Sequence, residues 1–218
     1  MKKASKIIVI FIFAMSVFVG VGAVEVFADT ASQTNTVNEP VKFIAKQKGK
    51  KVVLKWNKSK NVKGYIIYKN GKKFKTLKKN KLTDKKVKKN KVYSYKIKAY
   101  TIANGKKVFS NSGQTVSIIM TDKKSKKVNA GRFKYIKNQY TISLNGKVKL
   151  QGEAYPSKKL KKKKVLSRKL TWSSSDTSLA TVNSRGVVKA NNNMKTGTVI
   201  IYAKAHNGLT KKVKINIE

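Results

Sequence analysis

The strongest chemical signal in the sequence is a basic run, SKKLKKKKVLSRK, which extends from Ser157 to Lys169. It contains seven lysines, one arginine and no acid. Arginine offers a planar fork for phosphate or carboxylate groups, whereas lysine is a strongly hydrated point charge. The run therefore predicts electrostatic binding of polyanions with little stereochemical choice. The candidate residues are Lys158, Lys159, Lys161, Lys162, Lys163, Lys164 and Arg168.

Positive charge extends over the whole chain and is not confined to this run. The 218 residues include 52 lysines and arginines against 8 acids, a net charge of +44, and only three of the basic residues are arginine. Such a charge destabilises a compact fold by self-repulsion, but it also keeps a protein soluble. Two interpretations follow: a surface that binds polyanions, or a lysine bias that serves solubility alone.

A second candidate surface combines aromatic rings with cations. Tyr68 and Tyr100 are out of phase with the apolar residues of their segments, so they are expected on an outer sheet face that they share with Lys96 and Lys98. Aromatic rings edged with cations can bind sugars or anionic chains. The alternative is that these are ordinary solvent-exposed side chains of a sheet, with no ligand.

The sequence contains no convincing catalytic constellation. The Ser173–Ser175 run with Asp176 lacks the positioned base that a nucleophile needs, and the acids are too sparse for paired-carboxylate chemistry. His206 is the single histidine, and beside the Asn207-Gly208 turn it is expected to be a surface residue rather than a metal ligand. We therefore predict no enzyme, no metal site and no cofactor.

The N-terminus predicts the compartment. A basic start, MKKASK, precedes the apolar residues Ile7 to Val24, and VFA follows at Val26 to Ala28. This pattern is typical of a secretory signal at 1–28, cut after Ala28 and followed by a flexible leader at 29–37. An uncleaved anchor is the alternative, since 18 apolar residues are at the lower limit for spanning a bilayer. We expect a secreted or envelope-associated protein with no membrane span after cleavage.

Short segments of period two must position these groups. In KVVLKW, Val52, Leu54 and Trp56 fall on one face, and Asn70-Gly71 separates two alternating runs, which is a strong hairpin signal. Similar segments recur every 8 to 12 residues, and no convincing amphipathic helix is visible. The expected fold class is all-β, with two tandem Ig-like β-sandwiches.

Residues 38–121 resemble a fibronectin type III domain. The resemblance rests on VVLKW with Trp56, on GYIIYK, on VYSYKIKAYT and on SNS before the last strand. It implies that Trp56 lies in the core. It also implies that Tyr93 forms the tyrosine corner of that family, in which the hydroxyl bonds back to nearby backbone.

Residues 129–218 look like a bacterial Ig-like domain of group 2, and residues 122–128 are expected to be a linker. The resemblance rests on LTWSSSDTSLATVNSRGVVKA, GTVIIYAKA and KVKINI. It implies that Trp172 belongs to the core. The basic run is a departure, because it is longer than the connection usual at that place in the family.

Both resemblances are typical of bacterial surface and secreted proteins, in which such domains are adhesive modules, spacers or appendages of enzymes; the fold alone does not decide among these. The expected function is that of a non-enzymatic cell-envelope protein that binds anionic cell-wall or host polysaccharide, of the teichoic acid or glycosaminoglycan type. The alternative is a structural spacer or accessory module, with another surface protein as its partner. No motif favours specific binding of nucleic acid.

Overall fold

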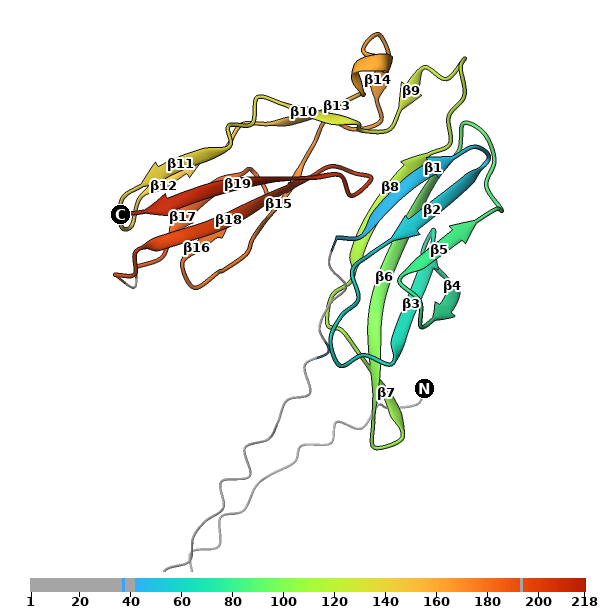
Figure 1. Ribbon diagram of the computed structural model, residues 1–218, viewed down its shortest axis with the longest axis horizontal. Coiled ribbons are helices and arrows are strands. Elements are labelled where there is room, and N and C mark those ends of the chain that lie inside the picture. The colour runs from blue at the N-terminus through green and yellow to red at the C-terminus, as the bar shows by residue number, and fades with distance from the viewer. Residues whose placement is uncertain (1–36, 38–41, 193) are drawn as a thin grey trace, which may run out of the picture. The chain divides into compact units, whose positions relative to one another are not determined.

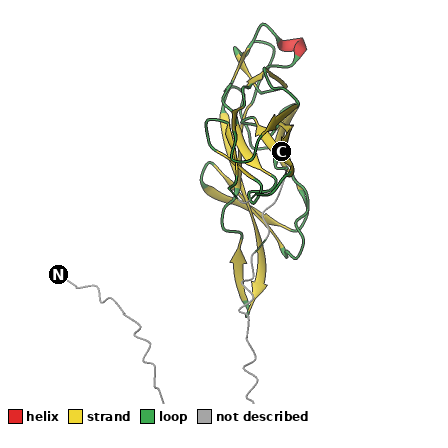
Figure 2. Ribbon diagram, turned by 90° about the vertical axis from the view of Figure 1, so that its left-hand side faces the viewer, coloured by secondary structure: helices red, strands yellow, loops and turns green. Residues whose placement is uncertain are grey.

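The computed structural model describes residue 37 and residues 42–192 and 194–218. The predicted signal and nearly all of the predicted leader therefore lie outside the described residues. Within the described part, strands predominate (Figure 1), and the short 3₁₀ helix η1, Lys158–Leu160, is the red element of Figure 2. None of the helices found there has the length and apolar character needed to cross a membrane.

The first sandwich consists of two sheets (Figure 1). One has the strand order β1-β2-β5, and the other has the order β4-β3-β6-β7, with β8 also paired to β6. All of these pairings are antiparallel. The strands are β1 (Ile44–Lys48), β2 (Lys51–Lys55), β3 (Gly64–Lys69), β4 (Lys72–Leu77), β5 (Lys81–Asp84), β6 (Val92–Ala103), β7 (Lys106–Phe109) and β8 (Gln114–Ile119).

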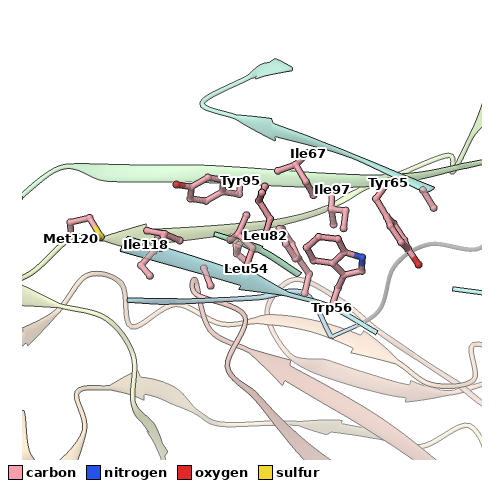
Figure 3. Packing of buried hydrophobic residues seen from close by; sticks show 14 residues of the cluster. Leu54, Trp56, Tyr65, Ile67, Leu82, Tyr95, Ile97, Ile118 and Met120 are labelled. Carbon is pink, nitrogen blue, oxygen red and sulfur yellow. The ribbon is translucent and has the colours of Figure 1, made fainter. Parts of the chain in front are cut away.

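The inner faces of these sheets form one hydrophobic core (Figure 3). Val52, Leu54 and Trp56 are all buried, as their period of two predicts. The Trp56 ring meets Phe43 and Tyr65 edge-on, at centroid distances of 6.0 and 5.3 Å. The expectation that Trp56 is a core residue rather than an exposed platform is therefore confirmed.

Two local predictions in this sandwich are also confirmed. Asn70 and Gly71 both have positive φ, at 50° and 82°, as the tight β3–β4 hairpin requires. At the tyrosine corner, the Lys88 backbone N–H donates to Tyr93 Oη at 2.7 Å. The hydroxyl thus fixes the chain just before β6 begins.

The second sandwich has a four-stranded sheet of order β11-β19-β18-β15 and a three-stranded sheet of order β12-β17-β16, with two short pairs, β10-β13 and β14-β9. Strand β11 runs parallel to β19, and β14 runs parallel to β9. The strands are β9 (Lys127–Val128), β10 (Arg132–Lys134), β11 (Gln139–Ile142), β12 (Lys147–Lys149), β13 (Glu153–Tyr155), β14 (Lys164–Val165), β15 (Thr171–Ser174), β16 (Ala180–Val182), β17 (Val187–Ala190), β18 (Gly197–Lys204) and β19 (Thr210–Ile217).

The core of the second sandwich lies between its two larger sheets, around Val188, Ile201 and Ile215, each fully buried. Trp172 packs against this core and is partly buried. The Trp172 ring leaves little room for a side chain at position 186, because a Cβ there would lie 3.0 Å from Trp172 Nε1. Gly186 also has a φ of 78°, which favours glycine. Trp172 therefore lies at the edge of the core, so its predicted place there is confirmed only in part, and the described chain is all-β with two tandem Ig-like sandwiches.

Candidate functional site

The basic run is an ordered part of the second sandwich. After η1, Lys163 N–H donates to the Leu160 carbonyl at 2.9 Å, and β14 pairs with β9. Val165 is buried in a small apolar cluster, which anchors the run to the sandwich, whereas Leu160 is 40% exposed. The predicted lysines that are exposed to solvent are Lys158, Lys159, Lys161, Lys162 and Lys164.

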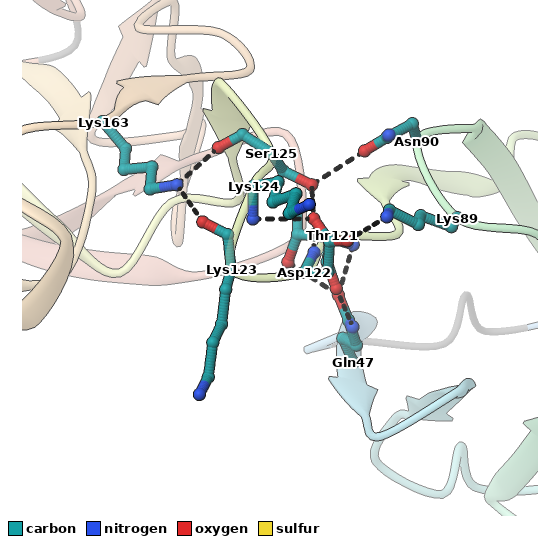
Figure 4. A network of polar contacts seen from close by, with 9 residues as sticks. All are labelled: Gln47, Lys89, Asn90, Thr121, Asp122, Lys123, Lys124, Ser125 and Lys163. Atoms are coloured by element: carbon teal, nitrogen blue, oxygen red, sulfur yellow. Dashed lines mark hydrogen bonds and ion pairs between the residues drawn. The ribbon is translucent and has the colours of Figure 1, made fainter.

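Lys163 has a different environment from the other lysines of the run. Its Nζ donates to the carbonyls of Lys123 and Ser125, at 2.6 and 2.8 Å (Figure 4). The side chain thus fixes the run to the linker, and two of its three N–H donors already have partners. Lys163 is therefore a structural lysine within the predicted binding set.

The same linker is also bonded to the first sandwich (Figure 4). Just before the linker, the Gln47 side chain both donates to and accepts from the Thr121 backbone, at 2.7 and 2.8 Å. Asp122 forms an ion pair with Lys89, and the hydrogen bond from Lys89 lowers the pKa of Asp122 to about 2. The Ser125 hydroxyl donates to Asn90 Oδ1 at 2.7 Å. The linker is consequently hydrogen-bonded along much of its length.

Acids neutralise little of the positive charge. The ion pairs found among the described residues are Lys69–Asp84, Lys89–Asp122 and Arg168–Glu153. The lysines greatly outnumber these partners, in the first sandwich as well as in the second. Both sandwiches therefore present a cationic surface, of which the basic run is the densest part.

The predicted aromatic face forms only in part. The register places Tyr68 opposite Lys96 and Gly64 opposite Tyr100, so these side chains do lie on one face of the sheet with Lys98. Tyr68 is partly exposed and Lys96 is exposed, but Tyr100 is only 8% exposed.

The burial of Tyr100 has two visible causes. Phe109 covers its ring at a centroid distance of 6.3 Å, and Lys107 Nζ lies 5.0 Å from the ring centroid. Tyr100 is thus not the open platform expected from its phase, because Phe109, its cross-strand neighbour on β7, packs against it. Lys98 is also partly engaged, since its Nζ lies 3.4 Å from the Asn111 carbonyl.

The first sandwich also contains a buried polar cluster that the sequence does not predict. Asp84 is 1% exposed, and its carboxylate accepts from Lys69 Nζ at 2.6 Å, from Tyr95 Oη at 2.6 Å and from Lys86 N–H at 2.8 Å. Burial raises the pKa of Asp84, but these hydrogen bonds outweigh that effect and hold it below its ordinary value. Burial and the neighbouring carboxylate raise the pKa of Tyr95. We call Lys69, Asp84 and Tyr95 the buried cluster.

A second unanticipated group surrounds Tyr155 on β13. Lys134 Nζ, Arg168 Cζ and Arg132 Cζ lie 4.5, 4.9 and 5.8 Å from the ring centroid of Tyr155. Tyr135 meets the same ring edge-on at 6.2 Å. Of these residues, only Arg168 belongs to the predicted binding set. We call Arg132, Lys134, Tyr135, Tyr155 and Arg168 the arginine–tyrosine cluster.

The turn at His206 is more enclosed than the sequence suggests. Asn207 is 6% exposed, and its side-chain amide donates to the Ala130 carbonyl at 2.9 Å. The carbonyls of His206 and Asn207 accept from the N–H groups of Ser117 and Ala45. Burial lowers the pKa of His206. The expectation of a surface turn residue is therefore wrong, because the turn contacts β1 and β8.

The Ser173–Asp176 segment is a hydrogen-bonded strand end. Asp176 N–H donates to Ser174 Oγ at 3.2 Å, and the Ser178 hydroxyl donates to Asp176 Oδ1 at 2.6 Å. The bonds from Ser178 lower the pKa of Asp176. This local pattern satisfies backbone groups, as expected for serine and aspartate at strand ends. Across the described residues, no three His, Cys, Asp or Glu side chains are grouped so that they could hold a metal ion.

Comparison with known proteins identifies no family. No family model matches the chain, and no curated protein matches it.

Several solved structures share partial likeness. One is the spore cortex lytic enzyme SleM of Clostridium perfringens, with 26% identity, 37% of this chain and 27% of that chain covered and a TM-score of 0.32. Another is an FN3tt mutant, with 23% identity, 40% and 100% covered and a TM-score of 0.35. A third is the central fibronectin III array of RIM-binding protein, with 12% identity, 85% and 71% covered and a TM-score of 0.34. At these TM-scores the likenesses support no conclusion about activity.

Proposed function

We propose that this is a secreted, non-enzymatic protein of the bacterial cell envelope that binds anionic polymers through its lysine-rich surface. The observation that carries the proposal is the excess of exposed lysine over acid, which three ion pairs in the described part of the chain leave almost uncompensated. A surface of this kind concentrates polyanions and releases their counterions on binding.

The order of the basic run adds to this argument. Because η1, β14 and the Lys163 bonds fix the backbone, less conformational entropy is lost when the run binds than for a free loop. Six of its seven lysines remain exposed. The structure thus holds a dense row of cations in place and leaves their ammonium groups in solvent.

We infer that the second sandwich is a group 2 bacterial Ig-like domain and that the first is a fibronectin type III domain. The ligand would be a cell-wall polymer such as teichoic acid or a host glycosaminoglycan. Secretion rests on the N-terminal pattern of charge and hydrophobicity.

A spacer or accessory module is the second candidate function, and one observation favours it. Linker residues Asp122 and Ser125 are bonded to Lys89 and Asn90 and also to Lys163, so the linker is an ordered connection, as a spacer would require. In that case the lysines would serve solubility, and polyanions would bind only at low salt.

Binding to purified cell wall, with and without its teichoic acid, and to heparin at several salt concentrations separates these functions. We expect affinity to fall steeply and smoothly as salt rises, because phosphate or sulfate contacts release counterions. Absence of salt-dependent binding near physiological ionic strength would leave the spacer as the better account.

A matched pair of variants tests whether binding depends on positive charge spread over the whole surface or on the basic run alone. One replaces the exposed run lysines Lys158, Lys159, Lys161, Lys162 and Lys164 by Ser and keeps Lys163. The control replaces five exposed lysines of the first sandwich, Lys72, Lys73, Lys75, Lys78 and Lys79. We expect both variants to weaken binding and to flatten the salt dependence without abolishing either. Complete loss in the first variant alone would make the run a dedicated site.

A further inference from the structure

Two of the three arginines in the chain gather at one tyrosine. Among 52 basic residues only Arg132, Arg168 and Arg185 are arginine, yet the first two both lie against the ring of Tyr155. Arg185 is an exposed residue of the β16–β17 turn. In a chain that otherwise uses lysine, this meeting of two guanidinium groups indicates a function that a point charge does not perform.

The β10–β13 pair places these groups on its outer face. Arg132 is directly opposite Tyr155, and Lys134 is directly opposite Glu153. The intervening pair, Phe133 and Ala154, belongs to the apolar cluster beneath. The alternation of the strands therefore directs the cations and the ring away from the core. Backbone pairing also holds Arg168 there, because its carbonyl accepts from Ala154 N–H at 2.9 Å.

Tyr135 is the exposed edge of this cluster. Its side chain is 63% exposed, and its backbone has a φ of 63°, in the left-handed region that a bulky residue rarely adopts. Its ring meets the Tyr155 ring edge-on, so one flat face of Tyr135 is free of that contact. A strained, exposed aromatic residue of this kind is a reason to look for a ligand.

The arginines keep donors available for an anion. Each guanidinium has five N–H donors; Arg132 uses Nε for the Pro156 carbonyl at 3.0 Å, and Arg168 makes only a long contact of 3.4 Å to Glu153. The Arg168 side chain is 63% exposed. An incoming anion could therefore replace the weak contact to Glu153 without disturbing the core.

We propose that the arginine–tyrosine cluster is a binding site for one anionic sugar unit of a polysaccharide. Arg132 and Arg168 would hold the carboxylate or sulfate group through their planar N–H forks, and the free face of Tyr135 would pack on the sugar ring. This inference rests on the proposed function and adds to it a defined site and a ligand class. It selects sugar-ring polymers such as heparin over polymers of glycerol phosphate, which have no ring for Tyr135.

The test compares short heparin oligosaccharides with two ring-free polyanions, inorganic polyphosphate and unglycosylated glycerol-phosphate teichoic acid. The double variant Arg132→Lys/Arg168→Lys keeps the net charge and removes both forks. We expect its affinity for heparin oligosaccharides to fall about tenfold while the salt dependence stays unchanged. The matched control, Arg185→Lys, changes the third arginine and should bind as the wild type does.

A second variant tests the ring. Tyr135→Gly suits the positive φ and should weaken heparin binding about fivefold, with no change for either ring-free polymer. Equal loss for all three polymers would overturn the sugar contact, and a heparin affinity unchanged in the double arginine variant would overturn the site. Either result is compatible with salt-dependent binding by the wild type. The proposal that the lysine-rich surface binds polyanions would then still hold, and only the arginine–tyrosine site would be overturned. If the wild type binds no polyanion near physiological salt, both proposals are wrong.

Discussion

The two sandwiches each place cations against tyrosine rings, but the acids beside those cations differ in exposure. In the first, Lys69 Nζ lies 4.5 Å from the Tyr93 ring centroid and 2.6 Å from the carboxylate of Asp84, which is almost fully buried. In the second, Lys134 Nζ lies at the same 4.5 Å from Tyr155, on an outer face. The acid near that ring, Glu153, is 41% exposed in its side chain.

Burial decides what such similar groups can do. A buried cation with an acid at hydrogen-bond distance is satisfied, and breaking the pair would leave an uncompensated charge inside the fold. The ion pair between Arg168 and Glu153 is exposed and long, so it contributes little to stability and leaves Arg168 free to bind. We therefore assign the buried cluster to folding and the arginine–tyrosine cluster to recognition, although their residue types overlap.

The largest expected effect comes from Asp84→Asn. Asparagine has a similar shape but removes the negative charge next to Lys69, whose side chain is only 15% exposed. Removing one partner of a buried ion pair typically costs several kcal/mol, and we expect a loss of about 3 kcal/mol in the free energy of unfolding. Urea denaturation measures it. Asp122→Asn is the matched control at the exposed pair with Lys89, and should cost much less, because solvent screens that pair.

The same variant has a signature in its pH dependence. Because the pKa of Asp84 is lower in the folded state than in the unfolded state, its contribution is present above the unfolded value of about 3.9 and is lost as pH falls through the folded value. Asp84→Asn should remove this component of acid destabilisation below about pH 4. Parallel acid curves for wild type and variant would contradict the role of Asp84 in the buried cluster.

An intermediate effect is expected for Tyr93→Phe at the tyrosine corner. Phenylalanine keeps the ring beside Lys69 and removes only the acceptor for Lys88 N–H, so the cost should be about 1 kcal/mol. Tyr65→Phe, which removes the acceptor for Ser59 N–H at 2.8 Å, is a matched control at another hydroxyl. A loss of 3 kcal/mol or more at Tyr93 would show that the corner belongs energetically to the buried cluster.

Much of the fold could be read from the sequence because its signals are local. Alternation placed Val52, Leu54 and Trp56 in the core, and Asn70-Gly71 indicated a turn whose positive φ values few other residues tolerate. These signals act within a few residues, and backbone geometry determines them. The tyrosine corner could also be predicted from the sequence, because the residues around Tyr93 resemble a known motif.

The candidate sites were harder to predict from the sequence, because they depend on contacts between segments that are distant in the chain. Phase alone put Tyr100 on an outer face, but it could not show that Phe109 would cover it. Charge density selected Lys163, although the carbonyls that accept from it lie about 40 residues earlier, at Lys123 and Ser125. The scarcity of arginine was visible in the sequence, but the meeting of Arg132 with Arg168 depends on tertiary contact.

The smallest effect on stability should come from Tyr135→Gly, and it tests the comparison most sharply. A left-handed φ costs an L-residue about 1–2 kcal/mol, which glycine avoids, while glycine loses about 0.5–1 kcal/mol through its more flexible unfolded chain. The net gain from these two effects is largely offset by loss of the edge-on contact between the Tyr135 and Tyr155 rings. We expect the free energy of unfolding to stay within about 0.5 kcal/mol of wild type, at the level of ordinary surface substitutions. A loss above 1.5 kcal/mol in urea denaturation would show that the exposed ring stabilises the fold. The arginine–tyrosine cluster would then resemble the buried cluster in purpose, and its assignment to recognition would fail even if heparin binding also weakened.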